Sequence, residues 1–165
     1  GAAVGLRSLS NFYESMIPVE YTSNEAAVSL EPAGTSVIPD NIRLGVYRVA
    51  ELAMGNVAKH AEATICKVSW DYDEIDQQLV MTVSDDGKGF DPATLRQTGL
   101  GMVNIGDYAD AMSATLDIDS APGVGTNLKL TIPFEVPQSS ATADDSSLNE
   151  SPNVIGGTGE QASAA

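Results

Sequence analysis

Apolar side chains recur every three or four residues in three stretches of the chain, and this spacing predicts amphipathic helices. The stretches are residues 5–16, about 41–60 and about 101–113. Asp40 lies directly before the second stretch and has a side chain suited to capping the start of a helix. The apolar stripe expected to bury the second helix consists of Ile42, Val46, Val49, Ala53 and Val57.

Other stretches alternate between apolar and polar residues, as strands do when they bury one face. They comprise residues 17–22, 65–70, 79–83, 115–119 and 126–134. Only an acidic turn, DYDEIDQQ, separates the second and third of them, which predicts an antiparallel hairpin. Helices combined with a largely antiparallel sheet indicate the α+β fold class.

Three regions of different character follow from these elements. Residues 17–137 contain most of the predicted helices and strands and should form one domain with its own core. Residues 1–16 are predicted to be an N-terminal helix that could be the end of an upstream domain. Residues 138–165 consist mainly of Ser, Ala, Gly, Thr, Asn, Asp and Glu. Because such a segment can bury little apolar surface, we expect it to be a disordered acidic tail.

The formal net charge of −15 limits the partners of the chain. Such a charge repels nucleic acid and anionic membranes, and no apolar run approaches the roughly 20 residues that cross a bilayer. We therefore expect no nucleic-acid partner and no direct membrane contact. A phosphate-bearing ligand would need Mg²⁺, backbone N–H groups and a few local cations. Cys66, the single cysteine, excludes a disulfide framework and is expected to be an inert core thiol.

The segment VSDDGKGF, residues 83–90, places two carboxylates and two glycines directly after a predicted strand. The carboxylate of Asp85 could accept hydrogen bonds from an exocyclic amine, and the glycines would let the backbone approach a flat ligand. A plain turn or a calcium-type loop is the alternative, although the spaced acidic ligands and terminal Glu of an EF-hand are absent. The segment alone favours neither reading.

Three weaker motifs accompany it. The segment TGLGM, residues 98–102, could present helix N–H groups to a phosphate, although such glycines often only relieve crowding. In RVAELAMGNVAKHA, Asn56 could ligate Mg²⁺ and Lys59 and His60 could meet phosphates. A surface Asn and a cation pair that complements the helix dipole explain that pattern more simply. In APGVGTNLKLTIP, a turn and a strand, Thr126 offers a hydroxyl.

Taken together and in this order, the four segments resemble the histidine kinase-type ATPase superfamily, which includes gyrase, MutL and heat-shock chaperones. The nearest resemblance is to sensor kinases of the nitrate-sensor and DesK type, whose Asn-bearing helix reads like YRIVQEALTNVVKHA. Residues 47–61 here are YRVAELAMGNVAKHA. Residues 99–133 follow the pattern GLGL…GG.L.I.S.PG.GT.V.L.IP without a gap. The resemblance covers about residues 5–134 and implies a two-layer α/β sandwich with helices on one face of a mixed, mostly antiparallel sheet.

The resemblance also implies a site for ATP and Mg²⁺. Asn56 would coordinate Mg²⁺ between the phosphates, with Lys59 and His60 close by. Asp85 would accept from the adenine amino group, and Thr126 would support the adenine end of the ligand. The other implied positions are Gly87 and Gly89 in the adenine pocket, and Gly99, Gly101 and Met102 at the lid hinge and the phosphate-facing helix start.

The chain departs from the family pattern at positions that matter for phosphoryl transfer. The usual Glu four residues before the Asn is Leu52, which cannot act as a base, so no catalytic residue is assigned. Glu51 is adjacent, but one residue along a helix turns a side chain by about 100°. The usual Arg of the later helix is Tyr108, the usual Gly-Gly is Ser113-Ala114, and the lid at residues 91–98 is short. Nucleotide binding should survive these changes better than transfer does.

The resemblance implies a cytoplasmic histidine protein kinase, or the cytoplasmic part of a membrane-bound sensor kinase. Its ATP-binding catalytic domain would pass the γ-phosphoryl to a histidine on a separate dimerisation domain, and a response regulator would receive it next. His60 is the only histidine and belongs to the Asn motif, so this chain cannot complete the reaction alone. Two alternatives stay open: a degenerate module that binds a nucleotide or a partner without catalysis, and a serine kinase of the anti-sigma-factor type.

Overall fold

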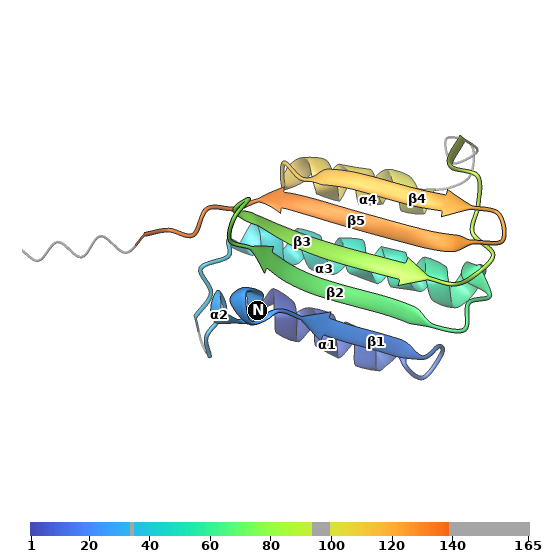
Figure 1. Cartoon of the computed structure of the whole chain (residues 1–165), viewed down its shortest axis with the longest axis horizontal. Coiled ribbons are helices and arrows are strands. Elements are labelled where there is room, and N and C mark those ends of the chain that lie inside the picture. Colours follow the sequence, from blue (N-terminus) through green and yellow to red (C-terminus); the bar gives the residue numbers. More distant parts are fainter. Residues whose placement is uncertain (34, 94–99, 139–165) are drawn as a thin grey trace, which may run out of the picture.

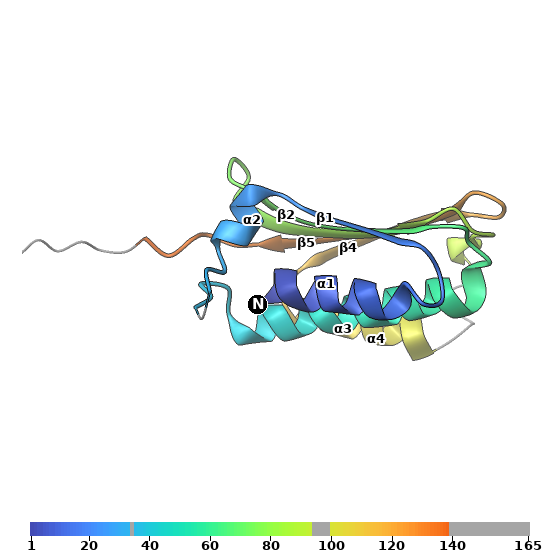
Figure 2. The same ribbon diagram turned by 90° about the horizontal axis from the view of Figure 1, so that it is seen from below.

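The helices and strands pack into two layers, with a five-stranded sheet on one side and three longer helices on the other (Figures 1 and 2). The computed structural model describes residues 1–33, 35–93 and 100–138. The helical layer contains α1 (Ala2–Tyr13), α3 (Asp40–Asn56) and α4 (Leu100–Ala111), and the short α2 (Glu25–Ser29) lies at one end. No helix in these ranges is both long and apolar enough to cross a bilayer.

The sheet has the strand order β1-β2-β3-β5-β4. Only β1 and β2 are parallel, and every other neighbouring pair is antiparallel. The strands are β1 (Val19–Ser23), β2 (Cys66–Asp73), β3 (Gln78–Asp85), β4 (Thr115–Ala121) and β5 (Gly125–Pro133). This architecture confirms the predicted α+β sandwich with a mixed, mostly antiparallel sheet and helices on one face.

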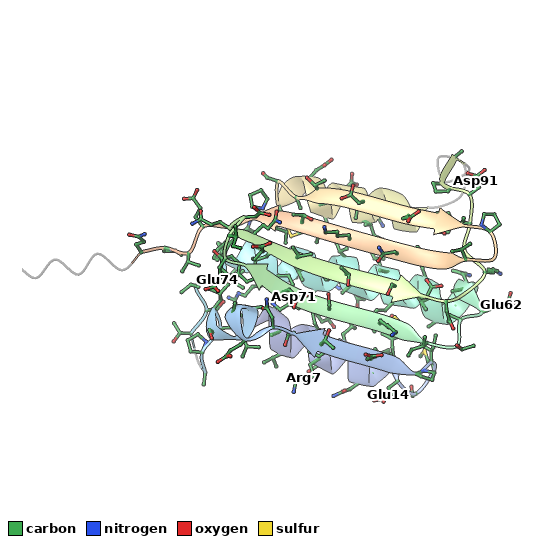
Figure 3. The ribbon with its side chains drawn as sticks, viewed as in Figure 1. Arg7, Glu14, Glu62, Asp71, Glu74 and Asp91 are labelled. Atoms are coloured by element: carbon green, nitrogen blue, oxygen red, sulfur yellow. The ribbon has the colours of Figure 1, made fainter. Side chains whose placement is uncertain are left out.

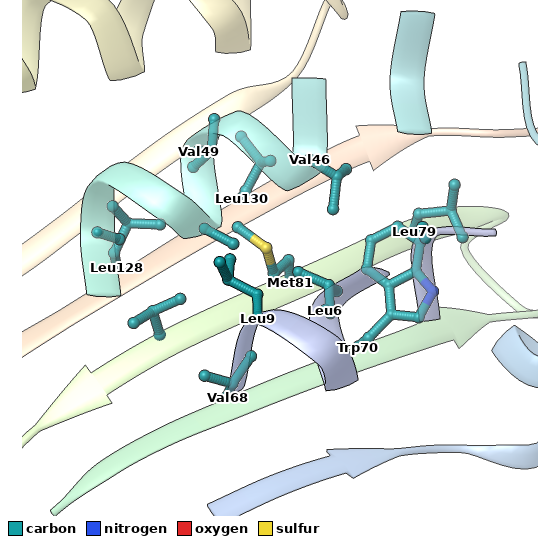
Figure 4. Close-up of a cluster of buried hydrophobic side chains, with 14 of the residues drawn as sticks. Leu6, Leu9, Val46, Val49, Val68, Trp70, Leu79, Met81, Leu128 and Leu130 are labelled. Atoms are coloured by element: carbon teal, nitrogen blue, oxygen red, sulfur yellow. The ribbon is translucent and has the colours of Figure 1, made fainter. Parts of the chain in front are cut away.

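The hydrophobic core lies between the two layers (Figure 4). Alternate residues of β2, β3 and β5 point toward the helices, and most of these positions are apolar, as expected from a period of two. Helix α1 contributes Leu6 and Leu9 to the same core that Val46 and Val49 of α3 enter. Each fully buried side chain of this kind stabilises the fold by about 1.5–3 kcal/mol.

The predicted helix over residues 41–60 is interrupted near its end. Helix α3 stops at Asn56, and residues Val57–Ala61 form a π-helical turn, η1, before Glu62 takes a left-handed conformation with φ of 54°. Single π-helical turns are frequent at functional sites. Apolar spacing did not reveal it, since one π-turn hardly alters the pattern.

One further expectation about local structure was wrong, and one short helix was not predicted. Asp40 does not cap α3: the cap position is Pro39, and the Asp40 carboxylate instead pairs with the guanidinium of Arg43. Helix α2 was not predicted because it has only five residues, although its cap is clear, with Asn24 Oδ1 accepting the N–H of Ala27 at 2.8 Å. Of the predicted tail, only Gln138 lies within the described residues.

Candidate functional site

The segments with candidate chemistry converge at one end of the molecule. Strand β3 ends there, and the β4–β5 turn, η1 and the start of α4 lie around it (Figure 1). Figure 3 shows Glu62, directly after η1, and Asp91 at this end, with Glu74 of the β2–β3 turn at the opposite end. Segments that are far apart in the sequence are therefore neighbours at one rim of the sheet.

A row of polar side chains crosses the helix-facing side of the sheet at this end. In the strand register Cys66 pairs with Asp85, Asp85 with Thr126, and Thr126 with Ser120. Paired residues share a face, and the neighbouring row on that face is apolar, with Val68, Val83, Leu128 and Ile118. We call Cys66, Asp85, Thr126 and Ser120 the polar row; it forms the boundary of the apolar core.

Asp85 is the ionisable group at the centre of the polar row. Burial raises the pKa of its carboxyl, the charge of Asp86 acts in the same direction, and backbone N–H groups of Gly87 and Thr126 oppose them. The N–H of Gly87 donates to Oδ1 at 2.8 Å. A carboxylate has about four lone-pair positions, so Asp85 can still accept from a ligand. This fits the predicted role as acceptor for an amino group.

Cys66, the next member of the row, is fully buried and carries a free thiol. Burial, with a smaller effect of the Asp85 charge, raises the pKa of this thiol to about 12. A thiol that stays protonated is a poor nucleophile and a poor metal ligand. The structure confirms that Cys66 is a core residue, as predicted, and places it beside the candidate site.

The glycines of DDGKG and of the β4–β5 turn let the two segments meet backbone to backbone. Gly89 has φ of +58°, and a Cβ there would lie 2.1 Å from the carbonyl oxygen of Ala121. Gly125 has φ of +97°, and a Cβ there would lie 2.1 Å from the carbonyl oxygen of Asp85. On the other side, the N–H of Lys88 donates to the carbonyl oxygen of Ala61 at 2.7 Å. The loop is thus clamped between the β4–β5 turn and η1.

Asp86, the second carboxylate of the motif, has a structural role that the sequence did not indicate. Its Oδ1 accepts the N–H groups of Thr64 and Ile65 at 2.7 and 3.1 Å, and its Oδ2 accepts the Thr64 hydroxyl. The Thr64 contacts are the main reason that the pKa of Asp86 is lowered. Neighbouring carboxylates of one motif therefore differ: Asp85 faces the site, and Asp86 ties β3 to the loop before β2.

The residues predicted to meet phosphates lie at the end of α3 and in η1. Asn56 is the last residue of α3; it is half-buried, and its side-chain amide has no hydrogen-bond partner among the described residues. Lys59 and His60 are exposed. A third basic side chain near this end, Lys88, pairs with Glu62, with 2.9 Å between Nζ and Oε1. Lys59 and His60 are thus the exposed basic side chains that η1 offers to a ligand.

Two of the remaining predicted positions lie at the start of α4. Gly101 and Met102 lie in the first turn of α4, where backbone N–H groups lack partners within the helix. Such N–H groups, with the helix dipole, suit a phosphate. Gly99 and residues 94–98 of the lid lie outside the described residues, so their roles stay predictions.

The position of the missing general base is apolar in structure as well as in sequence. Leu52 is partly buried and packs against the core. Glu51 points elsewhere: its Oε2 lies 2.8 Å from Nη1 of Arg48, and its carbonyl oxygen accepts the Tyr13 hydroxyl at 3.3 Å. Tyr108, in place of the usual Arg, also packs against the core. Glu51 therefore does not replace the absent carboxylate.

Ser120 is a site residue that sequence reasoning missed. It is only 8% exposed, and its Oγ accepts the N–H of Phe90 at 3.0 Å and donates to the carbonyl oxygen of Gly125 at 2.9 Å. Its Oγ also lies 3.1 Å from Oγ1 of Thr126. The family pattern quoted above has a serine at this position, but the sequence alone did not indicate what its hydroxyl contacts.

Known proteins resemble this chain over most of its folded part. An uncharacterized sensor-like histidine kinase of Chloroflexus aurantiacus is 32% identical over 124 residues, which is 68% of this chain and 20% of that protein. The oxygen sensor histidine kinase NreB of Staphylococcus carnosus is 35% identical over 99 residues, 58% of this chain and 27% of that protein. The chain thus spans about a fifth to a quarter of the length of these relatives.

Solved structures share the fold at lower identity. The histidine kinase domain of a blue-light activated kinase from Erythrobacter litoralis has a TM-score of 0.66 and 17% identity, covering 81% of this chain and 61% of that one. The ATP-binding domain of PrrB from Mycobacterium tuberculosis has a TM-score of 0.57 and 17% identity, covering 81% and 93%. The sequence model described as histidine kinase-, DNA gyrase B- and HSP90-like ATPase matches residues 41–136. With this match over more than half of its length, the chain belongs to the family of histidine kinase-, DNA gyrase B- and HSP90-like ATPases.

Proposed function

We propose that this chain is the ATP-binding catalytic domain of a sensor histidine kinase. The observation that carries the proposal is Asp85 at the centre of the polar row, half-buried and with lone pairs free, in a chain of this ATPase family. Its carboxylate would accept the amino group of adenine. The start of α4 and the exposed side chains of Lys59 and His60 in η1 would face the phosphates.

Mg²⁺ would bind through Asn56. Within the described residues, no group of three His, Cys, Asp or Glu side chains is placed to hold a metal ion. Mg²⁺ usually keeps several waters and takes one or two protein oxygens together with substrate phosphates, so the amide oxygen of Asn56 fits that demand. The bound ion would neutralise phosphate charge, which matters in a chain with a net charge of −15.

Phosphoryl transfer would need a second domain. His60 is the only histidine and lies in η1, so the acceptor histidine would come from a dimerisation domain of the same kinase, and a response regulator would act next. We place the reaction in the cytoplasm, where ATP is available. Since Leu52 supplies no base, the chain would contribute by positioning the nucleotide and by balancing its charge.

One observation favours a second candidate, a domain that binds ATP without transferring its phosphoryl group. Leu52 packs against the core and Glu51 pairs with Arg48, so the described part of α3 offers no carboxylate in the usual place for the base. Transfer of labelled phosphate from ATP to a histidine-bearing dimerisation domain, supplied separately, decides between the candidates.

Calorimetric titration with ATP, with and without Mg²⁺, tests the nucleotide site directly. We expect Mg²⁺-dependent binding that Asp85→Asn weakens strongly. Asp119→Asn is the matched control, because it removes the same charge from an exposed position of β4. Absence of binding at millimolar ATP, or equal weakening by both variants, would contradict the proposal.

A further inference from the structure

The hydrogen bonds around Ser120 allow its proton to be located by counting donors and acceptors. A serine hydroxyl has one proton and two lone pairs. The N–H of Phe90 can only donate, so it uses one lone pair, at 3.0 Å. The carbonyl oxygen of Gly125 can only accept, so the Ser120 proton points to it, at 2.9 Å. One lone pair of Ser120 Oγ is left.

This count fixes the direction of the third contact. Oγ1 of Thr126 lies 3.1 Å from Oγ of Ser120, and either oxygen could donate if the pair were isolated. Because the Ser120 proton is already committed to Gly125, a hydrogen bond between the two hydroxyls requires Thr126 as its donor. Thr126 Oγ1 is then left with lone pairs only, so any other group that it meets must be a donor.

The direction of the Thr126 hydroxyl also affects Asp85, its neighbour in the polar row. The two residues are directly paired between β3 and β5, so their Cβ atoms are about 5 Å apart on the same face of the sheet. An unengaged Thr126 hydroxyl could turn to the carboxylate and occupy a lone pair that a ligand needs. Ser120 removes that competition because it accepts the proton.

We propose that Ser120 is a positioning residue that holds the Thr126 hydroxyl as an acceptor, so that Thr126 and Asp85 together select a purine with an amino group at position 6. This inference rests on the proposed nucleotide site. A 6-amino group donates to both oxygens, whereas a 6-oxo group would bring its lone pairs against theirs. The pair therefore discriminates adenine from hypoxanthine more strongly than Asp85 alone would.

Paired titrations with ATP and inosine triphosphate test the proposal, since these ligands differ in the base at position 6. In Ser120→Ala the Thr126 proton is free to turn toward Asp85 or a 6-oxo group. We expect the ratio of the two affinities to fall by about three- to tenfold, the range of one neutral hydrogen bond. Ser120→Thr, which keeps a hydroxyl, should retain the ratio, and Ser120→Cys replaces the alanine variant if that protein does not fold.

A double variant tests whether Ser120 acts through Thr126. Thr126→Val should lower the ratio by a similar factor, and adding Ser120→Ala should lower it no further. Equal weakening of both nucleotides by Ser120→Ala would mean a structural role and would overturn the inference while the nucleotide site stands. If the unaltered chain binds neither nucleotide, the inference fails together with the proposed function.

Discussion

The helix-facing side of the sheet differs at its two ends. At one end Tyr72, Leu79 and Ile132 continue the apolar core, and the Tyr72 ring meets Phe134 edge-on with 6.1 Å between the ring centroids. At the other end the same strands finish in the polar row. Both ends have the same strand alternation, so the contrast lies in side-chain chemistry. The apolar end stabilises the fold, whereas the polar end gives up apolar burial for groups that can bind a ligand.

The largest effect should come from the apolar side of this comparison. Leu130→Ala removes a fully buried side chain from β5, so the free energy of unfolding should fall by about 2–5 kcal/mol. Denaturant unfolding followed by circular dichroism measures the change. Ile75→Ala is the control, because Ile75 is 94% exposed and its truncation should leave stability nearly unchanged.

Asp85→Asn should have the opposite effects to Leu130→Ala. ATP binding should weaken, and the free energy of unfolding should stay nearly unchanged. A hydrogen bond to a charged group contributes about 1.5–3 kcal/mol, so ATP affinity should fall by about 10- to 100-fold. Burial raises the pKa of Asp85, which means that the native state disfavours its charge, so the variant should not unfold more easily. Calorimetry and denaturant unfolding measure the two quantities; a stability loss as large as that of Leu130→Ala would remove the contrast between the ends.

Gly125→Ala should affect both quantities at once. The residue has φ of +97°, and a new Cβ would press on the carbonyl of Asp85. Strain of this kind costs about 1–3 kcal/mol of folding free energy, and a displaced β3 end should also weaken ATP binding. Gly106→Ala serves as the control, since a Cβ there meets nothing within 4 Å. Equal effects of the two substitutions would show that the β4–β5 turn is not held by this contact.

The smallest expected effect concerns how Asp85 and Asp86 make the free energy of unfolding depend on pH. The native pKa of Asp86 lies below its ordinary value of 3.8, so its stabilising contribution exists above that pH and is lost as the pH falls through the native value. The native pKa of Asp85 lies above 3.8, so its contribution exists below 3.8 and is lost as the pH rises through the native value. The free energy of unfolding should be measured between acid and neutral pH for Asp86→Asn, Asp85→Asn and the parent chain. The difference between variant and parent should change with pH in opposite directions for the two variants. Slopes of the same sign would contradict the separate roles of the two carboxylates.

The linear pattern of residues determined the elements and the chemistry that the chain can offer. Apolar spacing identified the three longer helices and all five strands, because burial of one face imposes a period that the sequence must carry. The DDGKG segment offered a hydrogen-bond acceptor and the Asn56 segment offered an oxygen ligand for Mg²⁺, because each of these functions requires particular residue types. The core position of Cys66 also followed from its apolar neighbours.

Only the tertiary structure decided which side chains meet. The polar row joins residues from four strands, and its register depends on pairing between segments far apart in the chain, which no local pattern encodes. The different roles of Asp85 and Asp86 also depend on this pairing, since the contact of Asp86 with Thr64 joins the end of β3 to the residues before β2. Ser120 gained its role from the close approach of three backbone segments. Composition and spacing limit what each residue can do, and long-range packing selects which of those possibilities is used.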